Sequence, residues 1–391
     1  MLETVAKYDS PKINGVGGKR GKGKNISYFS QKKSAYFAFE DLFRQLNFKY
    51  LIISYSNQGI VPIEDLVNLA KQFAKNEIVN VDFIEYSEYK NHRSSKKQNG
   101  KKLNEVLISF EKKLEIKKSP LNYSGSKDTI FNKINGCLPM HIGTFIDAMG
   151  GAFNVGANIV ATDKVIYNEK NKFIYKLIEM NLSNEKKYIV NKVEQLIEEY
   201  NLSKSNKINY SKLRTSYNKT HDIFKLFVLH MYSFQNMIRF NTNNFFNTPC
   251  GVSGYSDDLK KRIINFMPKT KCFKLMNCDY LEIDYSIFPK GTLFYFDPPY
   301  YITNAAYNDG KRGADARWSI DDEENLLNYL LKLNLFGHKF LLSNVIEHKG
   351  RKHQLLIDWA FQHNFEIIEV GISGWRYEKK EVLIRNYKEG D

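Results

Sequence analysis

One acid stands directly before two prolines and a tyrosine, in the tetrapeptide DPPY at residues 297–300. Residues 293–296 are an apolar run, and Pro298 and Pro299 must end a strand because proline lacks an N–H donor. The pattern predicts a short buried strand that stops at Asp297. Ligands bind at the carboxyl ends of strands in open α/β sheets, so Asp297, the stiff turn and the ring of Tyr300 form a candidate ligand site.

A second acid, Asp147, ends another apolar run and is followed by Gly150 and Gly151. Paired glycines let a ligand approach the backbone closely, and we expect a helix start behind them with its N–H groups facing the ligand. Glu169 ends a further short strand, where an acid can accept hydrogen bonds from a ribose. The motifs GxGxxG and GxxxxGK[ST] are absent, which argues against a dinucleotide dehydrogenase and a phosphate-binding loop.

Composition indicates a globular protein with a polyanionic partner. The formal net charge is +15 in 391 residues, which favours nucleic acid over membrane because no amphipathic basic helix or lipidation motif is present. The four cysteines form no CxxC pair and have no matching histidine spacing, so neither a metal site nor a disulfide framework is expected. The N-terminus lacks a signal-peptide core and no apolar run is long enough to span a bilayer, which predicts a cytoplasmic protein.

Two distant segments share one order of patterns. Each contains a strand that runs into a Ser-Asn turn, then a helix, another strand and the tetrapeptide Glu-Val-Leu-Ile, at residues 105–108 and 381–384. The first copy carries basic, Gly- and Lys-rich loops at residues 11–24 and 93–102. We therefore expect one domain at residues 1–112, a charged linker at residues 113–120 and a second domain at residues 121–388.

Residues 121–388 resemble the DNA adenine methylase (Dam) family of methyltransferases, which use S-adenosyl-L-methionine (AdoMet). The matching motifs, in the family order, are NYSGSK, FIDAMGGAFNVG, NEKN, NMIRFNTNNFFNTPCG, NCDYLEI and DPPY. The resemblance implies an α/β, Rossmann-like methyltransferase sheet. The cofactor-binding residues it implies are Tyr123, Lys127, Asp147, Gly150, Gly151, Glu169, Asp279 and Asp297. The family's usual Glu-Pro-Phe before the glycines is Asp147, Ala148 and Met149 here, which changes the backbone contacts expected around the cofactor.

The resemblance also gives DPPY a chemical role. The amino group of adenine is a poor nucleophile because its lone pair is delocalised into the ring. A carboxylate at Asp297 and a backbone carbonyl of the Pro298–Pro299 turn would each accept one N–H and direct the lone pair at the sulfonium methyl. Tyr300 would stack on the flipped base.

Residues 172–275 do not fit a doubly wound sheet, and they predict a mainly helical target-recognition insertion. The stretch alternates helical segments with Asn- and Ser-rich loops and basic, aromatic sequence. Lys212 and Lys219 are candidates for phosphate contacts. The other DNA-binding candidates, for phosphates or base edges, are Arg214, Arg239, Asn241 and Asn247.

Residues 1–112 resemble the part of a second methylase that follows its DPPY motif. We expect a half-domain from a tandem methylase whose first half is missing or separately encoded. Unpaired strand edges favour a partner, either that half in trans or the surface of the second domain. For the whole chain we predict a site-specific adenine-N6 DNA methyltransferase that acts on double-stranded DNA as the modification component of a restriction-modification system, alongside a cognate restriction enzyme. The alternatives are a cytosine-N4 DNA methyltransferase and an inactive DNA-binding remnant.

Overall fold

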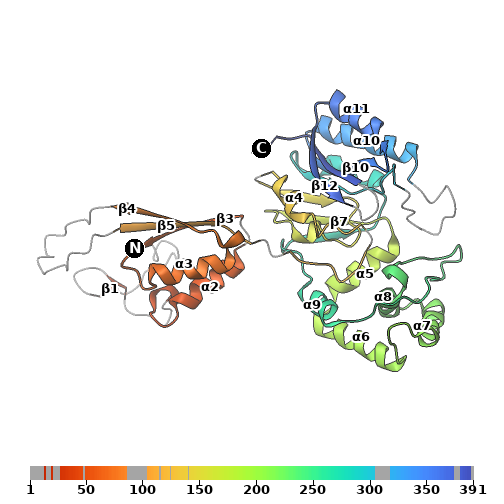
Figure 1. Cartoon of the computed structure of the whole chain (residues 1–391), viewed down its shortest axis with the longest axis horizontal. Coiled ribbons are helices and arrows are strands. Elements are labelled where there is room, and N and C mark those ends of the chain that lie inside the picture. The colour runs from red at the N-terminus through yellow and green to blue at the C-terminus, as the bar shows by residue number, and fades with distance from the viewer. Residues whose placement is uncertain are drawn as a thin grey trace, which may run out of the picture. The chain divides into compact units, whose positions relative to one another are not determined.

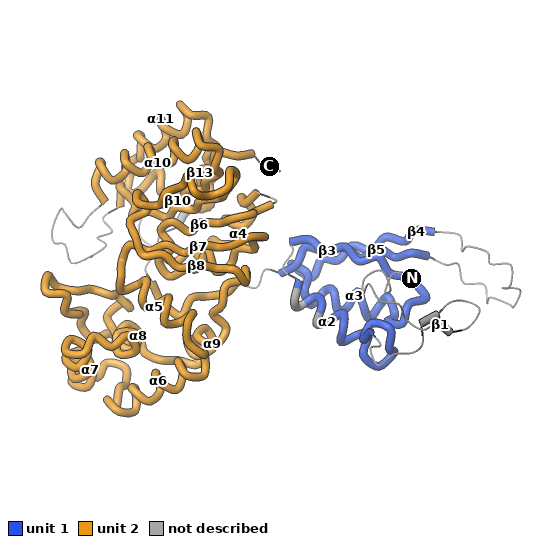
Figure 2. The backbone as a smooth tube through the Cα atoms, turned by 180° about the vertical axis from the view of Figure 1, so that it is seen from behind, with its two compact units in different colours: residues 1–115 blue, residues 116–391 orange. Residues whose placement is uncertain are grey.

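The protein divides into two compact units, Met1–Glu115 and Ile116–Asp391 (Figure 2). A computed structural model describes residues 13–14, 19–20, 27–46, 49–85, 104–113, 116–123, 125–139, 141–303, 318–373 and 379–388. Most of the basic loop at residues 11–24 and all of that at 93–102 lie outside these ranges.

The boundary falls inside the predicted linker, but only part of that linker connects the units. Ile116 packs against the core of the second unit. The backbone N–H of Lys117 donates to Asn158 at 2.7 Å, and that of Ser119 donates to Asn154 at 2.9 Å. Residues from Ile116 onward therefore belong to the second unit, which corrects the predicted linker of 113–120.

The second unit is built on a mostly parallel sheet with the strand order β12-β13-β10-β9-β6-β7-β8 (Figure 1). The strands are β6 (Thr144–Asp147), β7 (Lys164–Asn168), β8 (Phe273–Met276), β9 (Leu293–Phe296), β10 (Lys339–His348), β12 (Glu366–Ser373) and β13 (Lys379–Arg385), with β11 (Arg351–Lys352) paired to β10. Among the strands of this path, β13 alone runs in the opposite direction to the others. The arrangement confirms the predicted Rossmann-like methyltransferase fold, including the buried strand at residues 293–296.

Helices cover both faces of this sheet, as a parallel sheet with apolar strands requires. Helices α10 (Ile320–Phe336) and α11 (Gln354–Gln362) bury leucine and aromatic side chains against one face. Helices α4 (Phe131–Gly136) and α5 (Lys172–Ser183) pack in the core on the other face. In the described part of the chain, no helix is both long and apolar enough to cross a membrane.

The stretch predicted as a target-recognition insertion is mainly helical. It contains α5, α6 (Lys186–Glu199), α7 (Lys207–Thr220), α8 (Ile223–Tyr232) and α9 (Asp257–Asn265). From Leu226 to its end, α8 is buried, and α5, α6 and α7 contact it. Strand β8 begins at Phe273, so the last three residues of the predicted range 172–275 belong to the sheet instead.

The first unit repeats the order found at the end of the second. Its main elements are α2 (Ala35–Gln45), β3 (Tyr50–Ser56), α3 (Ile63–Phe73), β4 (Asn80–Glu85) and β5 (Asn104–Glu111), with a short pair β1 (Ile13–Asn14) and β2 (Lys19–Arg20) ahead of them. The sheet order β3-β5-β4 matches β10-β13-β12, and all of these pairs are antiparallel. Within the described ranges, short 3-10 helices lie at Tyr28–Ser30, Lys75–Glu77, Gly156–Asn158, Phe234–Asn236, Tyr280–Glu282 and Tyr285–Ile287.

The repeated Glu-Val-Leu-Ile occupies the same place in both sheets. Val106 and Ile108 of β5 are buried beneath α2 and α3, just as Val382 and Ile384 of β13 are buried with α10 and α11. The predicted Ser-Asn turn of the second copy is wrong, however. Residues 343–344 lie within β10, opposite residues 382–383 of β13, and the strand continues to residue 348.

Candidate active site

A single cavity at the carboxyl edge of the sheet brings the predicted cofactor residues together. It is lined by residues from the loops after β6, β7, β8 and β9, together with the segment before α4 and the start of α10. Among the lining residues are all those predicted to bind the cofactor, namely Tyr123, Lys127, Asp147, Gly150, Gly151, Glu169, Asp279 and Asp297. They converge because the carboxyl ends of neighbouring parallel strands meet at one edge.

The glycine loop after β6 is tightly packed from behind. A Cβ atom at Gly150 would lie 2.4 Å from the ring of Tyr167, so this position excludes any side chain. Gly151 has a φ of 48° and Phe153 a φ of 59°, and neither value fits a right-handed helix. The expected helix start behind the glycines is therefore wrong. Residues 151–155 form turns, and a 3-10 helix, Gly156–Asn158, follows them.

Asp147 ends β6 and is buried, with 1% of its surface exposed. Its Oδ2 accepts a hydrogen bond from the backbone N–H of Gly156 at 2.9 Å. Burial, helped by the nearby carboxylates of Asp297 and Glu169, raises the pKa of Asp147 to about 7, against the opposing effect of the Gly156 hydrogen bond. This carboxyl group therefore changes charge close to neutral pH.

Two further acids follow the next strands. Glu169 comes directly after β7 and accepts hydrogen bonds from the backbone N–H groups of Gly151 at 2.9 Å and Asn171 at 2.7 Å. Asp279 begins the 3-10 helix after β8, where it accepts from Leu281 N–H and from Lys170 Nζ at 2.7 Å. Each carboxylate thus shapes its own loop and lines the cavity.

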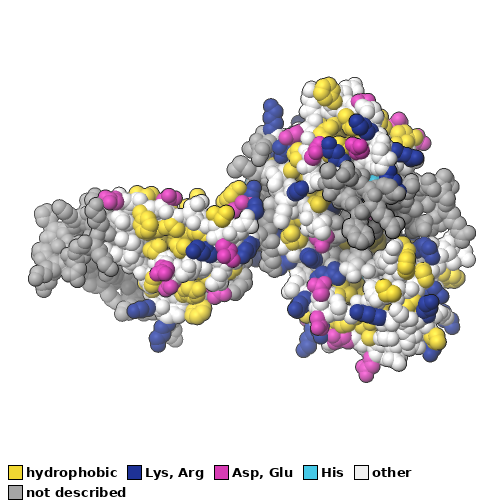
Figure 3. Space-filling model, viewed as in Figure 1, with side chains coloured by type: hydrophobic (Ala, Val, Ile, Leu, Met, Phe, Trp, Pro, Cys, Tyr) yellow, Lys and Arg dark blue, Asp and Glu magenta, His cyan; other side chains and the backbone are white. Residues whose placement is uncertain are grey.

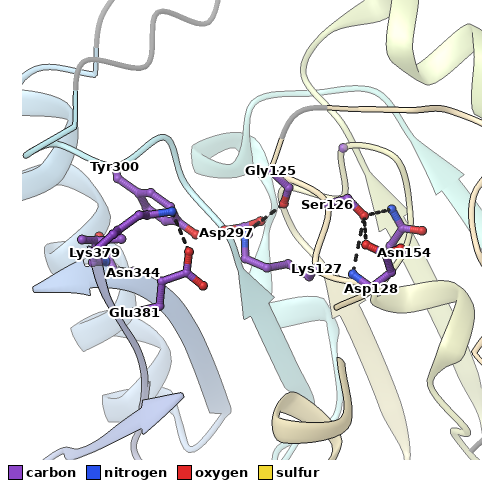
Figure 4. Close-up of polar contacts among 12 residues, drawn as sticks. Gly125, Ser126, Lys127, Asp128, Asn154, Asp297, Tyr300, Asn344, Lys379 and Glu381 are labelled. Carbon is purple, nitrogen blue, oxygen red and sulfur yellow. Dashed lines mark hydrogen bonds and ion pairs between the residues drawn. The ribbon is translucent and has the colours of Figure 1, made fainter. Parts of the chain in front are cut away.

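The carboxylate of Asp297 is held from both sides (Figure 4). Lys127 Nζ donates to Asp297 Oδ2 at 2.6 Å and to the carbonyl of Gly125 at 3.1 Å. The Tyr300 hydroxyl donates to Asp297 Oδ1 at 3.1 Å. The Lys127 side chain is only 7% exposed and that of Asp297 19%, so this ion pair is shielded from water.

These contacts influence the charge of Asp297. Burial raises the pKa of Asp297, while the positive charge of Lys127 and the hydroxyl of Tyr300 act in the opposite direction. The carboxylate of Glu381 in β13 adds to the rise. Lys127 therefore offsets part of the cost of keeping Asp297 ionised in this buried place.

Tyr300 also lies beside two cations. Lys379 Nζ is 4.6 Å from the centre of the Tyr300 ring, and Lys127 Nζ is 5.3 Å from it. Lys379 is paired with Glu381 at 2.6 Å, and both residues come from the beginning of β13 (Figure 4). Ammonium groups are attracted to the faces of aromatic rings, so both lysines make favourable cation–π contacts with the Tyr300 ring.

The predicted DNA-binding residues gather around one hairpin of the insertion. Arg239 Nε donates to Asn247 Oδ1 at 2.8 Å, across a strand pairing that joins Phe240 and Phe246. Asn241 closes the loop by accepting from the backbone N–H groups of residues 243 and 245. Arg214 lies on α7, and its guanidinium is 3.5 Å from the carbonyl of residue 248. Arg239, Asn241 and Asn247 thus lie within the hairpin and Arg214 at its base, whereas Lys212 and Lys219 are exposed on α7.

Sequence reasoning missed several residues of the site. Asn168, fully buried at the end of β7, donates to the carbonyls of Ala148 and Cys278 and so ties the loops after β6 and β8 together. Trp318 lines the cavity from the start of α10. A capping box of Ser319 and Asp322 marks that helix start in the sequence, but nothing there connects the tryptophan to the cavity.

Comparison with known proteins agrees with this geometry. Residues 123–371 match the D12 class N6 adenine-specific DNA methyltransferase family, and the chain belongs to that family. It is 45% identical over 388 residues to Modification methylase LlaI of Lactococcus lactis subsp. lactis. It is 34% identical to Modification methylase StsI of Streptococcus sanguinis and 34% identical to Type II methyltransferase M.FokI of Planomicrobium okeanokoites. These matches cover 99% of this chain but only 62%, 63% and 64% of the three relatives.

Proposed function

We propose that this protein transfers a methyl group from AdoMet to the N6 amino group of adenine in a specific double-stranded DNA sequence. One observation carries the proposal: Asp297 and Pro299 of the proline turn line the same cavity as every other residue predicted to bind the cofactor. Membership of the adenine-specific family supports adenine over cytosine as the target base.

The donor and acceptor set of the cavity suits AdoMet. The carboxylate of Asp147 would bind the ammonium group of the methionine part. Glu169 and Asp279 would accept hydrogen bonds from hydroxyl and amino groups of the nucleoside, while Gly150 and Gly151 leave their backbone open to close approach. When bound, AdoMet supplies a methyl group on a positively charged sulfur, and the sulfur keeps the bonding electrons after transfer.

Asp297 would orient the amine that receives the methyl group. In the free protein its Oδ2 accepts from Lys127, so the adenine amino group enters by replacing this ammonium or by sharing the carboxylate with it. The second N–H of the adenine amino group would donate to a carbonyl of the proline turn. Together the two hydrogen bonds would direct the nitrogen lone pair at the methyl group. The Lys127 ammonium thus occupies, in the free protein, a place beside Asp297 where the adenine amino group could donate its N–H.

Tyr300 would hold the flipped base by stacking. Its ring belongs to the same turn as Asp297, and the bond from its hydroxyl to that carboxylate fixes the ring's direction. Stacking on an aromatic ring offsets part of the few kcal/mol that unstacking a base costs. Lys379, beside the same ring, adds positive charge where a DNA strand would enter.

DNA would lie across the insertion. Helix α7 has the sequence KINYSKLRTSYNKT and contains no acid, with Lys207, Lys212 and Lys219 exposed along it. Figure 3 shows Lys and Arg side chains over α7, whereas the acidic side chains visible on the insertion lie over α6 and α9. We assign phosphate contacts to this helix and base contacts to the hairpin with Arg239, Asn241 and Asn247, where amide and guanidinium groups can pair with base edges.

The names of the relatives support a role in restriction-modification, with a cognate restriction enzyme as the second component. The shared order of elements supports the interpretation of the first unit as the later half of a second methyltransferase domain. The cytoplasm, where the DNA substrate and AdoMet are found, is the proposed location.

The test is direct identification of the product. Plasmid DNA incubated with the protein and AdoMet is digested to nucleosides, which are then identified by mass spectrometry. We expect N6-methyladenine at one recognition sequence. N4-methylcytosine would assign the alternative target, and absence of any methylated nucleoside despite AdoMet binding would contradict the proposed activity.

A further inference from the structure

The buried carboxylate of Glu323 in α10 accepts three hydrogen bonds. Its Oε2 accepts from Trp318 Nε1 at 2.6 Å, and its Oε1 accepts from His353 Nε2 at 2.9 Å and Asn344 Nδ2 at 3.2 Å. Glu323 has 0% of its surface exposed. A buried carboxylate is costly unless it is fully hydrogen-bonded, so this acid has a role that an apolar residue cannot fill.

The three donors come from different parts of the chain. Trp318 precedes α10, Asn344 lies within β10 and His353 is the N-cap of α11. His353 Nδ1 accepts from the backbone N–H of Leu356 at 3.3 Å, so Nε2 carries the proton that His353 donates to Glu323. Glu323 therefore joins α10, β10 and α11.

Trp318 is the member of this cluster that reaches the cavity. It lines the cavity together with Asp279, Tyr280, Leu281 and Pro299, which follow β8 and β9. Its indole N–H is bound to Glu323, which leaves the ring as a wall of the cavity. A flat aromatic ring in a cavity that also contains an acid and apolar side chains suits a purine nucleoside, whose ring stacks and whose polar edge accepts and donates hydrogen bonds.

We propose that Trp318 binds the nucleoside part of the cofactor and that Glu323 is the positioning residue that fixes its indole. This inference rests on the proposed use of AdoMet. Trp318, just before α10, would add a cofactor contact to those expected from the strand ends. Through Glu323, this contact is linked to β10 and α11. Loss of the Glu323 carboxylate should therefore weaken cofactor binding although Glu323 itself does not line the cavity.

Four variants test the proposal: Trp318→Ala, Trp318→Phe, Glu323→Gln and the control Glu324→Gln. Glu324 is exposed on the same helix, so its variant makes the same charge change outside the cluster. The probe is S-adenosylhomocysteine, with its Kd measured by calorimetry, and KM for AdoMet and kcat are measured with DNA. Glutamine at position 323 turns one acceptor into a donor and breaks at least one of the three bonds.

We expect Trp318→Ala to raise the Kd by about tenfold or more, and Glu323→Gln and Trp318→Phe to raise it by a smaller factor, with kcat changed less than KM. Glu324→Gln should match the wild type. The tryptophan fluorescence change on ligand binding should be smaller in Trp318→Phe.

A Kd within twofold of wild type in Trp318→Ala would overturn the contact, and this variant decides the question even if Glu323→Gln fails to fold. A normal Kd in folded Glu323→Gln would overturn the positioning role. If the wild type itself does not bind S-adenosylhomocysteine, the proposed function fails first.

Discussion

Replacing Asp147 by asparagine should make the ligand-free protein more stable at neutral pH while it destroys the cofactor site. Burial raises the pKa of Asp147 to about 7 from an ordinary value of 3.8. This difference corresponds to a cost of about 4 kcal/mol for holding the ionised carboxylate in the folded protein above pH 7. Asparagine carries no charge, and its oxygen can still accept the hydrogen bond from Gly156.

The stability difference between Asp147→Asn and the wild type should depend on pH in a definite direction. Between about pH 4 and pH 7 the folded protein retains a proton on Asp147 that the unfolded chain has lost, so wild-type stability falls as pH rises through this window. The variant has no such group. The stability difference between variant and wild type should therefore grow by about 1.4 kcal/mol for each pH unit between pH 5 and pH 7, and level off above it.

The measurement is urea unfolding of both proteins at pH 5, 6, 7 and 8. Asp163→Asn, which makes the same charge change at an exposed position, serves as the control. Calorimetry with S-adenosylhomocysteine should show that Asp147→Asn binds much more weakly, because the ammonium group of the ligand loses its counter-charge. A stability difference that stays constant from pH 5 to pH 8 would refute the reasoning from burial.

Four other changes test the remaining roles. Asp297→Ala should abolish methylation of plasmid DNA while the Kd for S-adenosylhomocysteine stays within a few fold; a near wild-type rate would remove Asp297 from catalysis. Tyr300→Ala should lower kcat/KM more than Tyr300→Phe, because stacking is worth about 1–3 kcal/mol and needs the ring; equal losses would give the role to the hydroxyl. Glu169→Ala should weaken cofactor binding by about 1–3 kcal/mol in calorimetry, since its carboxylate would lose hydrogen bonds to the ribose, and an unchanged Kd would exclude it. A chain that starts at Ile116 should keep methylation activity and specificity at low salt. It should lose DNA affinity as salt rises, because the basic loops no longer contact phosphates. A truncated protein that folds and binds AdoMet but does not methylate DNA would show that the first unit takes part in catalysis.

The strand ends of the site could be predicted because local sequence determines them. The apolar run before Asp297 ends at prolines, and Asp147 and Glu169 each end or follow a buried strand. Parallel strands then bring these acids to one edge without any further information. The loop between them could not be predicted in the same way, because the left-handed backbone at Phe153, a residue that rarely adopts it, prevents a helix there.

Contacts between distant residues left no signal in the sequence. Lys127 and Asp297 are 170 residues apart, and the motif gives the lysine no partner. Ser343 and Asn344 look like a turn because both residue types favour turns, yet they lie buried in β10, where the Asn344 side chain donates to Glu323. Tertiary hydrogen bonds overrode local preference at these positions.

The ion pair between Lys127 and Asp297 has a consequence for inhibitor design. A compound that offers an N–H group to the carboxylate of Asp297 competes with the Lys127 amine, which is tethered to the same chain and so has a high effective concentration. Such a compound gains little from imitating the amino group of adenine alone. A molecule that carries both an acceptor for the Lys127 ammonium and a donor for Asp297 would bind both members of the ion pair. Fragments that supply these two groups should therefore be screened together and not one at a time.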